Sequence, residues 1–145
     1  MLNEALKRYI DANYAPVLAE PPQALLSAIS NLGESFSDEL ISLVDERFEK
    51  DSDFYESANV SRQVFSYMKS NRSYKPSRPI IFACIIALRL NAAEAERLLK
   101  TAGLAFSNSN LSDVIIRYFI ENGLYDMEEI NEILYDYGQP LLGSN

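Results

Sequence analysis

Histidine is absent from this chain of 145 residues, and cysteine occurs only once. Without histidine, histidine-based catalytic triads and metal sites with histidine ligands are excluded. The single cysteine, Cys84, cannot form a disulfide within the chain, and its apolar surroundings predict a small core residue rather than a reactive thiol. Only five glycines occur, and no glycine-rich phosphate loop is present. We therefore expect no catalytic residue, no metal ligand, no cofactor and no small-molecule substrate. An enzyme that uses only carboxylates or tyrosine is a distant third hypothesis, and nothing in the sequence points to one.

Long hydrophobic runs are also missing. The most apolar segment, residues 80–88, is too short to span a bilayer, and Arg78 and Arg89 bracket it. Charged side chains interrupt residues 1–11, where a signal peptide would need an apolar stretch. The sequence therefore predicts a cytoplasmic protein without a membrane partner.

Positive charge is segregated within a chain whose net charge is -8. Residues 61–90 carry six basic side chains and no acidic one, whereas residues 34–60 and 91–145 have net charges of -7 and -6. Because the screening length at physiological salt is about 8 Å, the distant carboxylates would not erase a locally basic surface. Two interpretations stay open: a face for an anionic partner, or a solvated face that balances the neighbouring acidic helices.

Capping signals and apolar spacing recur at helical periods, and no convincing strand alternation appears, which predicts an all-α fold. Three residue pairs have the spacing of a helix-capping pair: Ser35 with Asp38, Asn91 with Glu94, and Asp126 with Glu129. Asn59 supplies a tight turn with positive φ. Helices are expected over residues 3–13, 22–32, 36–49, 54–58, 61–70, 78–90, 92–102, 110–121 and 127–137.

Three parts are predicted along the chain. Residues 1–33 form N-terminal helices with a linker at 15–22, residues 34–106 form a core, and residues 107–145 form a C-terminal helical extension. The segment 78–90 is apolar on nearly all sides, as expected of the buried centre of a domain.

The segment Asn59 to Ser66, together with Lys75-Pro76-Ser77 and Leu88-Arg89-Leu90-Asn91, resembles the repressor-type helix-turn-helix domain of bacteria and phages, the Cro and XRE class. This resemblance implies a five-helix core with additional N-terminal and C-terminal helices, and a recognition helix over about residues 61–70 that enters the DNA major groove. Arg62 and Gln63 would face base edges, and Lys69, Arg72 and Lys75 would lie near phosphates. The DNA-binding residues that it implies are Arg62, Gln63, Ser66, Tyr67, Lys69, Arg72 and Lys75.

A second similarity covers more of the chain. It is carried by residues 58–60, 74–77, 99–103, 118–123 and 139–143, which are similar to an uncharacterised bacterial module at the C-terminus of multidomain proteins, for example behind macro domains. The similarity implies an appended regulatory or targeting role.

Two functions are therefore expected. The preferred one is DNA binding or DNA-linked regulation in a bacterium or phage, because the basic residues cluster where the resemblance places the recognition helix and its following loop. Four contacts, from Arg62, Lys69, Arg72 and Lys75, would then give a log-log salt slope of roughly -3.6. The alternative is a protein-interaction module that docks a partner or a second copy of itself, because helix-turn-helix cores also serve as adaptors.

Overall fold

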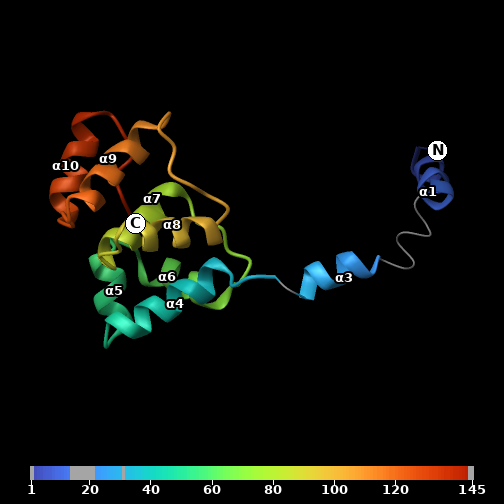
Figure 1. Ribbon diagram of the computed structural model, residues 1–145, viewed down its shortest axis with the longest axis horizontal. Helices are drawn as coiled ribbons and strands as arrows, with labels where there is room; N and C mark the ends of the chain where they lie inside the picture. The colour runs from blue at the N-terminus through green and yellow to red at the C-terminus, as the bar shows by residue number, and fades with distance from the viewer. Residues whose placement is uncertain (1, 14–21, 31, 144–145) are drawn as a thin grey trace. The chain divides into compact units, whose positions relative to one another are not determined.

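The computed structural model describes residues 2–13, 22–30 and 32–143 (Figure 1). Among these residues the regular elements are helices and no β-strand occurs, so the all-α prediction is confirmed. None of the described helices is long and apolar enough to cross a bilayer. The internal contacts divide the chain into two units, residues 1–33 and 34–145, which are described separately.

The first unit contains α1, Leu2–Asn13, and α3, Gln23–Ser30. Residues 15–21 of the predicted linker lie outside the described residues. No residue of α3 is buried. The large apolar side chains of α3 are between 43% and 53% exposed: Leu25, Leu26 and Ile29.

The second unit contains α4 to α10. Their bounds are Phe36–Arg47 for α4, Asp51–Ser57 for α5, Arg62–Ser70 for α6, Arg78–Ala87 for α7, Ala92–Thr101 for α8, Leu111–Glu121 for α9 and Met127–Asp136 for α10. Helix α4 packs against α5, α6 and α8, while α7 packs against α8 and α10. Helices α9 and α10 pack against each other within this same unit.

Side-chain caps start several of these helices. Ser35 with Asp38, and Asn91 with Glu94, form complete capping boxes, as the sequence predicts. At Asp126 the carboxylate accepts backbone N–H groups of the first turn of α10. These bonds satisfy donors that have no partner inside the helix, so the cap residues determine where each helix begins.

The largest differences from the predicted helix boundaries are at the start of α5 and the end of α7. Helix α5 begins at Asp51, so Asp53 lies in its first turn instead of capping it. Helix α7 ends at Ala87 and not at Leu90, because Arg89 adopts φ 52° and the Leu90 N–H turns back to a carbonyl of the last helical turn. This left-handed exit closes the helix and returns the following chain to the core.

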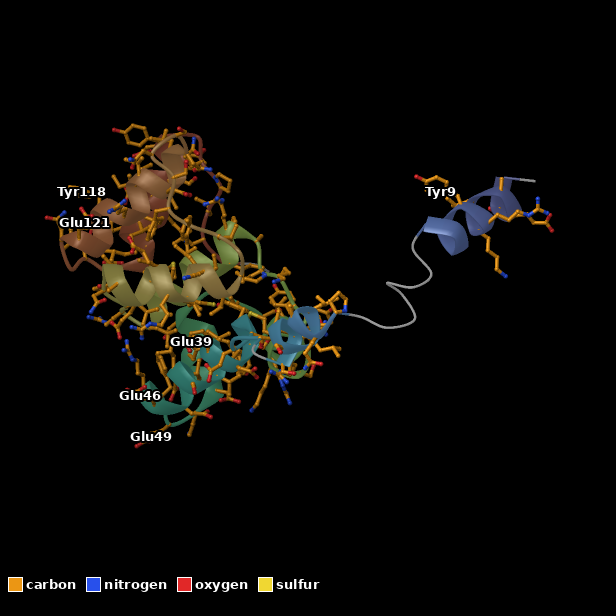
Figure 2. All side chains as sticks on the ribbon, turned by 45° about the vertical axis from the view of Figure 1, so that its right-hand side comes forward. Tyr9, Glu39, Glu46, Glu49, Tyr118 and Glu121 are labelled. Carbon is orange, nitrogen blue, oxygen red and sulfur yellow. The ribbon has the colours of Figure 1, made fainter. Side chains whose placement is uncertain are left out.

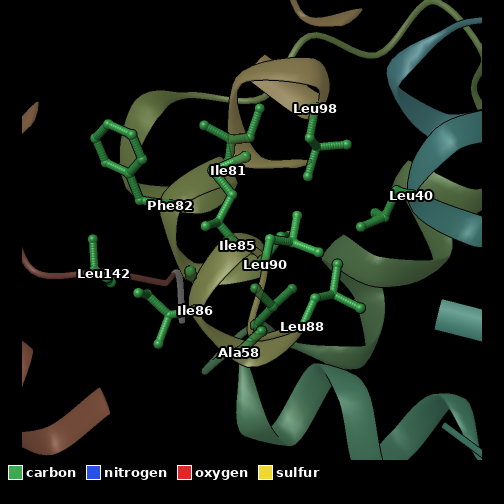
Figure 3. Close-up of a cluster of buried hydrophobic side chains, with 14 of the residues drawn as sticks. Leu40, Ala58, Ile81, Phe82, Ile85, Ile86, Leu88, Leu90, Leu98 and Leu142 are labelled. Carbon is green, nitrogen blue, oxygen red and sulfur yellow. The ribbon is translucent and has the colours of Figure 1, made fainter. Parts of the chain in front are cut away.

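Helix α7 is the centre of the second unit, as its apolar sequence predicts. Every side chain from Ile81 to Ile86 is at most 1% exposed. In Figure 3, Ile81, Phe82, Ile85 and Ile86 lie among apolar residues of other elements, such as Leu40, Leu98 and Leu142. Cys84 is fully buried here, and burial raises the pKa of its thiol to about 12, so it is a core residue.

The C-terminal tail is attached to the turn between α5 and α6. Asn59 adopts the expected positive φ, 55°, and its side-chain amide donates to the Leu142 carbonyl at 3.3 Å. The Leu142 N–H donates to Asn131 at 2.8 Å, and the Gly143 N–H donates to the Pro79 carbonyl at 3.2 Å. With Leu142 itself 2% exposed, the tail is part of the packed unit.

Because the tail packs on the Asn59 turn, we expect alanine substitutions at two of its glycines to lower the free energy of unfolding by different amounts. Gly138 and Gly143 both have positive φ, 68° and 94°, but a Cβ at Gly138 would meet open space whereas one at Gly143 would overlap the backbone oxygen of Asn59. Gly138→Ala should cost about 1–2 kcal/mol of left-handed strain. Gly143→Ala should cost clearly more, measured as the free energy of unfolding in urea. Equal losses would contradict the close packing of the tail on Asn59.

Candidate functional site

Helix α6 presents the polar face that the sequence predicts. The Ser61 hydroxyl accepts the Val64 N–H at 3.1 Å and starts the helix. Phe65 and Met68 are buried, and the Phe65 ring lies 5.6 Å from the ring centroids of both Phe54 and Tyr55. The opposite side of the helix is solvent-exposed: Arg62, Gln63, Ser66, Tyr67 and Lys69.

Two of the cations predicted to contact phosphates bind carboxylates of their own chain. Lys69 Nζ lies 3.0 Å from Asp51 at the start of α5. Arg72 donates twice to one carboxylate oxygen of Asp38, at 2.6 and 3.1 Å. Both acids belong to the acidic segment 34–60, so part of the segregated positive charge is balanced within the unit.

These contacts shift the titration of the paired groups. The hydrogen bond from Arg72 lowers the pKa of Asp38 below its ordinary value, and the hydrogen bond to Asp51 raises the pKa of Lys69. Each shift favours the charged form of the side chain. Because both pairs are solvent-exposed, they add little to stability, but they do occupy the cations.

The remaining basic residues of the segment divide into two kinds. Arg78 reaches the buried Asp113 at 2.5 Å, and Arg89 lies 6.0 Å from the ring centroid of Tyr125. Within the described residues, Arg62 and Lys75 are exposed and have no ion-pair partner. These two are the cations of the segment most available to an external anion.

The Arg78–Asp113 pair serves the fold. Asp113 Oδ2 accepts Arg78 and also the backbone N–H of Ser107 at 2.8 Å, which attaches the start of α9 to the start of α7. The other carboxylate oxygen is buried and has no hydrogen-bond partner in the described part of the chain. Removing Arg78 would leave a buried charge without compensation, so both residues are expected to be structural.

The Tyr67 ring is partly covered by its own domain, whereas a residue that stacks on bases needs an open ring face. Its ring meets the edge of Tyr74 with centroids 5.4 Å apart, and Tyr74 in turn lies 6.3 Å from Phe36. The Tyr67 side chain still has 55% of its surface exposed. One face of Tyr67 therefore packs on the domain while the rest faces solvent.

An apolar groove, which the sequence did not single out, lies along α9 and α10. Its volume is about 390 Å³. The lining residues are Leu111, Val114, Ile115, Tyr118, Phe119, Ile133 and Tyr137. Four of them are 42% to 60% exposed, and Figure 2 shows Tyr118 pointing outward from α9. Apolar side chains with a small number of polar neighbours are the lining that ligand and peptide grooves usually have.

The groove exists because α9 has two apolar faces. Ile116, Phe119 and Ile120 are buried against the unit, whereas Leu111, Val114 and Tyr118 remain in contact with water. Helical spacing in the sequence identifies both sets but not which set the core covers. The signal that could have found the groove is this excess of apolar residues around α9.

Acidic residues flank the groove. Helix α10 carries four carboxylates and no basic side chain: Glu128, Glu129, Glu132 and Asp136. Glu129 and Asp136 precede and follow Ile133 by four and three residues, which makes them its neighbours on the helix surface. An acidic ligand would be repelled here, while a neutral or basic one would not.

Among the described residues no group of three or more metal-ligating side chains comes together. Comparison of the chain with protein-family models, with curated proteins and with solved structures finds no match. The surface of α6 and the apolar groove are therefore judged on their own chemistry.

The ion pairing of Arg72 has a measurable consequence. Arg72→Ala should raise the pKa of Asp38 back toward 3.8, because the largest cause lowering that pKa is the hydrogen bond from Arg72. The folded-state pKa is depressed, so the pair is intact at neutral pH and is lost as the pH falls through that pKa. The Asp38 carboxyl carbon can be titrated by NMR, with Lys75→Ala as a control that should leave the pKa unchanged. An unchanged pKa in Arg72→Ala would show that Arg72 is free in solution.

Proposed function

We propose that this chain is a protein-interaction module of a bacterial or phage cytoplasmic protein, built on a helix-turn-helix-like core. The core would comprise α4 to α8. Three local features support a helix-turn-helix-like core: α5 has only seven residues, Asn59 has a left-handed backbone conformation, and Ser61 caps α6. Helices α9 and α10 provide the binding surface.

The apolar groove carries this proposal. Its exposed aliphatic and tyrosine side chains would be removed from water when a partner covers them, which favours binding of an apolar surface. Two neighbouring helices with apolar side chains at intervals of three and four residues form a surface into which the ridge of a third helix fits. The partner is therefore an amphipathic helix whose apolar face fills the groove and whose flanks lack acidic residues.

A designed peptide tests the groove directly. A fluorescent helix with leucines at i, i+3, i+4 and i+7 and lysine flanks should bind the full chain, and a glutamate-flanked version should bind more weakly. Val114→Asp should weaken binding by at least about tenfold, since a charge would be placed in the apolar groove. Fluorescence anisotropy measures both effects.

The matched control is Leu124→Asp. Leu124 is 40% exposed, close to the 42% of Val114, but it lies outside the groove. Thermal unfolding should show both variants folded. If the peptide does not bind, or if Leu124→Asp weakens binding as much as Val114→Asp, the groove is not the interaction site.

DNA-linked regulation is the second candidate, and the exposed α6 face supports it. Arg62 and Gln63 stand at the start of α6, where a recognition helix reads base edges, and Arg62 and Lys75 are unpaired within the described residues. Against it stands the carboxylate of Asp51 at the start of the neighbouring α5, which pairs with Lys69 and lines the same surface as Arg62.

The ion pairs revise the expected salt dependence of DNA binding. If only Arg62 and Lys75 neutralise phosphates, the log-log slope should be roughly -1.8, against roughly -3.6 if Lys69 and Arg72 also leave their carboxylates. Lys75→Ala should reduce the slope to roughly -0.9, while Lys69→Ala should leave it at the parental value. Gel shifts over a salt series measure the slopes, and absence of any shift at low salt would remove the DNA candidate.

A further inference from the structure

A separate cavity lies where the starts of α7 and α9 meet the C-terminal tail. All of its walls belong to the second unit, and it shares no lining residue with the apolar groove. Its volume is about 350 Å³. Cavities of this size accommodate small organic molecules, provided that their walls combine apolar surface with a few polar groups.

One part of the cavity wall is apolar. It is formed by Pro79, Phe82, Pro140 and Leu142. The Phe82 ring is stacked on the Phe106 ring with centroids 5.9 Å apart, and Phe82 and Leu142, both labelled in Figure 3, are only 1% and 2% exposed. Because the core holds these side chains in place, the apolar wall is formed before any ligand binds.

The polar part of the wall offers hydrogen-bond donors. The Asn110 side-chain oxygen accepts the Asp113 N–H at 3.2 Å as the cap of α9, so the Asn110 NH₂ group has no partner among the described residues. Arg78 bonds to Asp113 and to the Ala105 carbonyl through Nη1, and in the described part of the chain its Nε and Nη2 have no partner. Since an amide NH₂ group and a guanidinium donate to oxygen, this wall suits a ligand with oxygen acceptors.

The charge around the cavity favours an anionic acceptor. Of the residues that line it, Arg78 alone is charged, and its side chain is 33% exposed whereas that of its partner Asp113 is fully buried. Helices α7 and α9 both begin at this cavity, and the N-terminal end of a helix carries partial positive charge. The Ser77 side chain makes no capping bond to α7, which leaves the first N–H groups of that helix to another acceptor.

We propose that this cavity binds a small organic carboxylate with an aromatic or branched aliphatic body. The carboxylate accepts from Nε and Nη2 of Arg78, whose planar fork matches two carboxylate oxygens, and from the Asn110 amide. The body of the ligand packs against Phe82 and Leu142. This inference goes beyond the proposed function, because the ligand contacts the tail and the starts of α7 and α9 rather than the apolar groove.

Titration of the full chain with benzoate tests the site, with the side-chain N–H signals followed by two-dimensional NMR. A ligand of about nine non-hydrogen atoms should bind with a dissociation constant of about 1 to 10 mM. Benzoate should shift the Arg78 Nε–H and Asn110 amide signals until they saturate. Benzamide has the same shape without the charge, so it should bind at least about tenfold more weakly.

The variant Asn110→Ser separates ligand binding from folding. A serine hydroxyl can still cap α9, as Ser61 caps α6, but the amide donor is lost. Benzoate binding should weaken by about tenfold, since a hydrogen bond to a charged group is removed. The matched control is Asn91→Ser, because Asn91 caps α8 with the same bond and does not line the cavity. This control should bind benzoate like the parent, and thermal unfolding should show both variants folded.

The outcomes separate this inference from the proposed function. If benzoate leaves the Arg78 and Asn110 signals unchanged at about 10 mM, or if Asn110→Ser binds benzoate like the parent, the inference is overturned. If inorganic phosphate shifts these signals as strongly as benzoate does, the apolar wall contributes nothing and the organic ligand is overturned. Val114→Asp in the groove should leave benzoate binding unchanged, whereas its effect on the designed peptide tests the proposed function.

Discussion

The complete burial of α7 is the constraint on which the rest of the second unit depends. A helix that is apolar on every side must be covered on every side, and each large aliphatic side chain that is fully buried contributes about 1.5–3 kcal/mol. Helix α8 covers one side of α7, α10 covers another, and Leu142 of the tail packs beside it. Leu40 of the earlier helix α4 belongs to the same cluster, so elements from both earlier and later parts of the chain must assemble around α7.

Local chemistry in the sequence accounts for much of the fold. Ser35, Ser61 and Asn91 were identifiable as caps because their bonds reach only three residues along the chain. Asn59 was identifiable because few side chains tolerate its backbone conformation. The end of α7 was predicted at the wrong residue. Arg89 adopts a positive φ, and an arginine in the sequence gives no sign of this conformation. Burial of the residues on either side of Arg89 stabilises it.

The candidate sites were less accessible to sequence reasoning, since they depend on distant pairs. Arg72 and Asp38 are separated by 34 residues, and nothing local predicts that the guanidinium bonds that carboxylate. Part of the charge that is segregated along the chain is thus paired in space, at Lys69 and Arg72, while Arg62 and Lys75 have no ion-pair partner among the described residues. The exposure of α6 followed from its periodicity, whereas the exposure of Val114 and Tyr118 depends on which face of α9 the core covers.

The attachment of the tail to the Asn59 turn also has a kinetic meaning. The hydrogen bond from Asn59 to Leu142 joins residues separated by 83 positions, so a long loop must close before the contact forms. Such non-local contacts slow folding, and during synthesis this one cannot form until residue 142 has left the ribosome. Until then, the segment that packs on the turn between α5 and α6 is missing, and the central apolar helix lacks the part of its cover that Leu142 supplies.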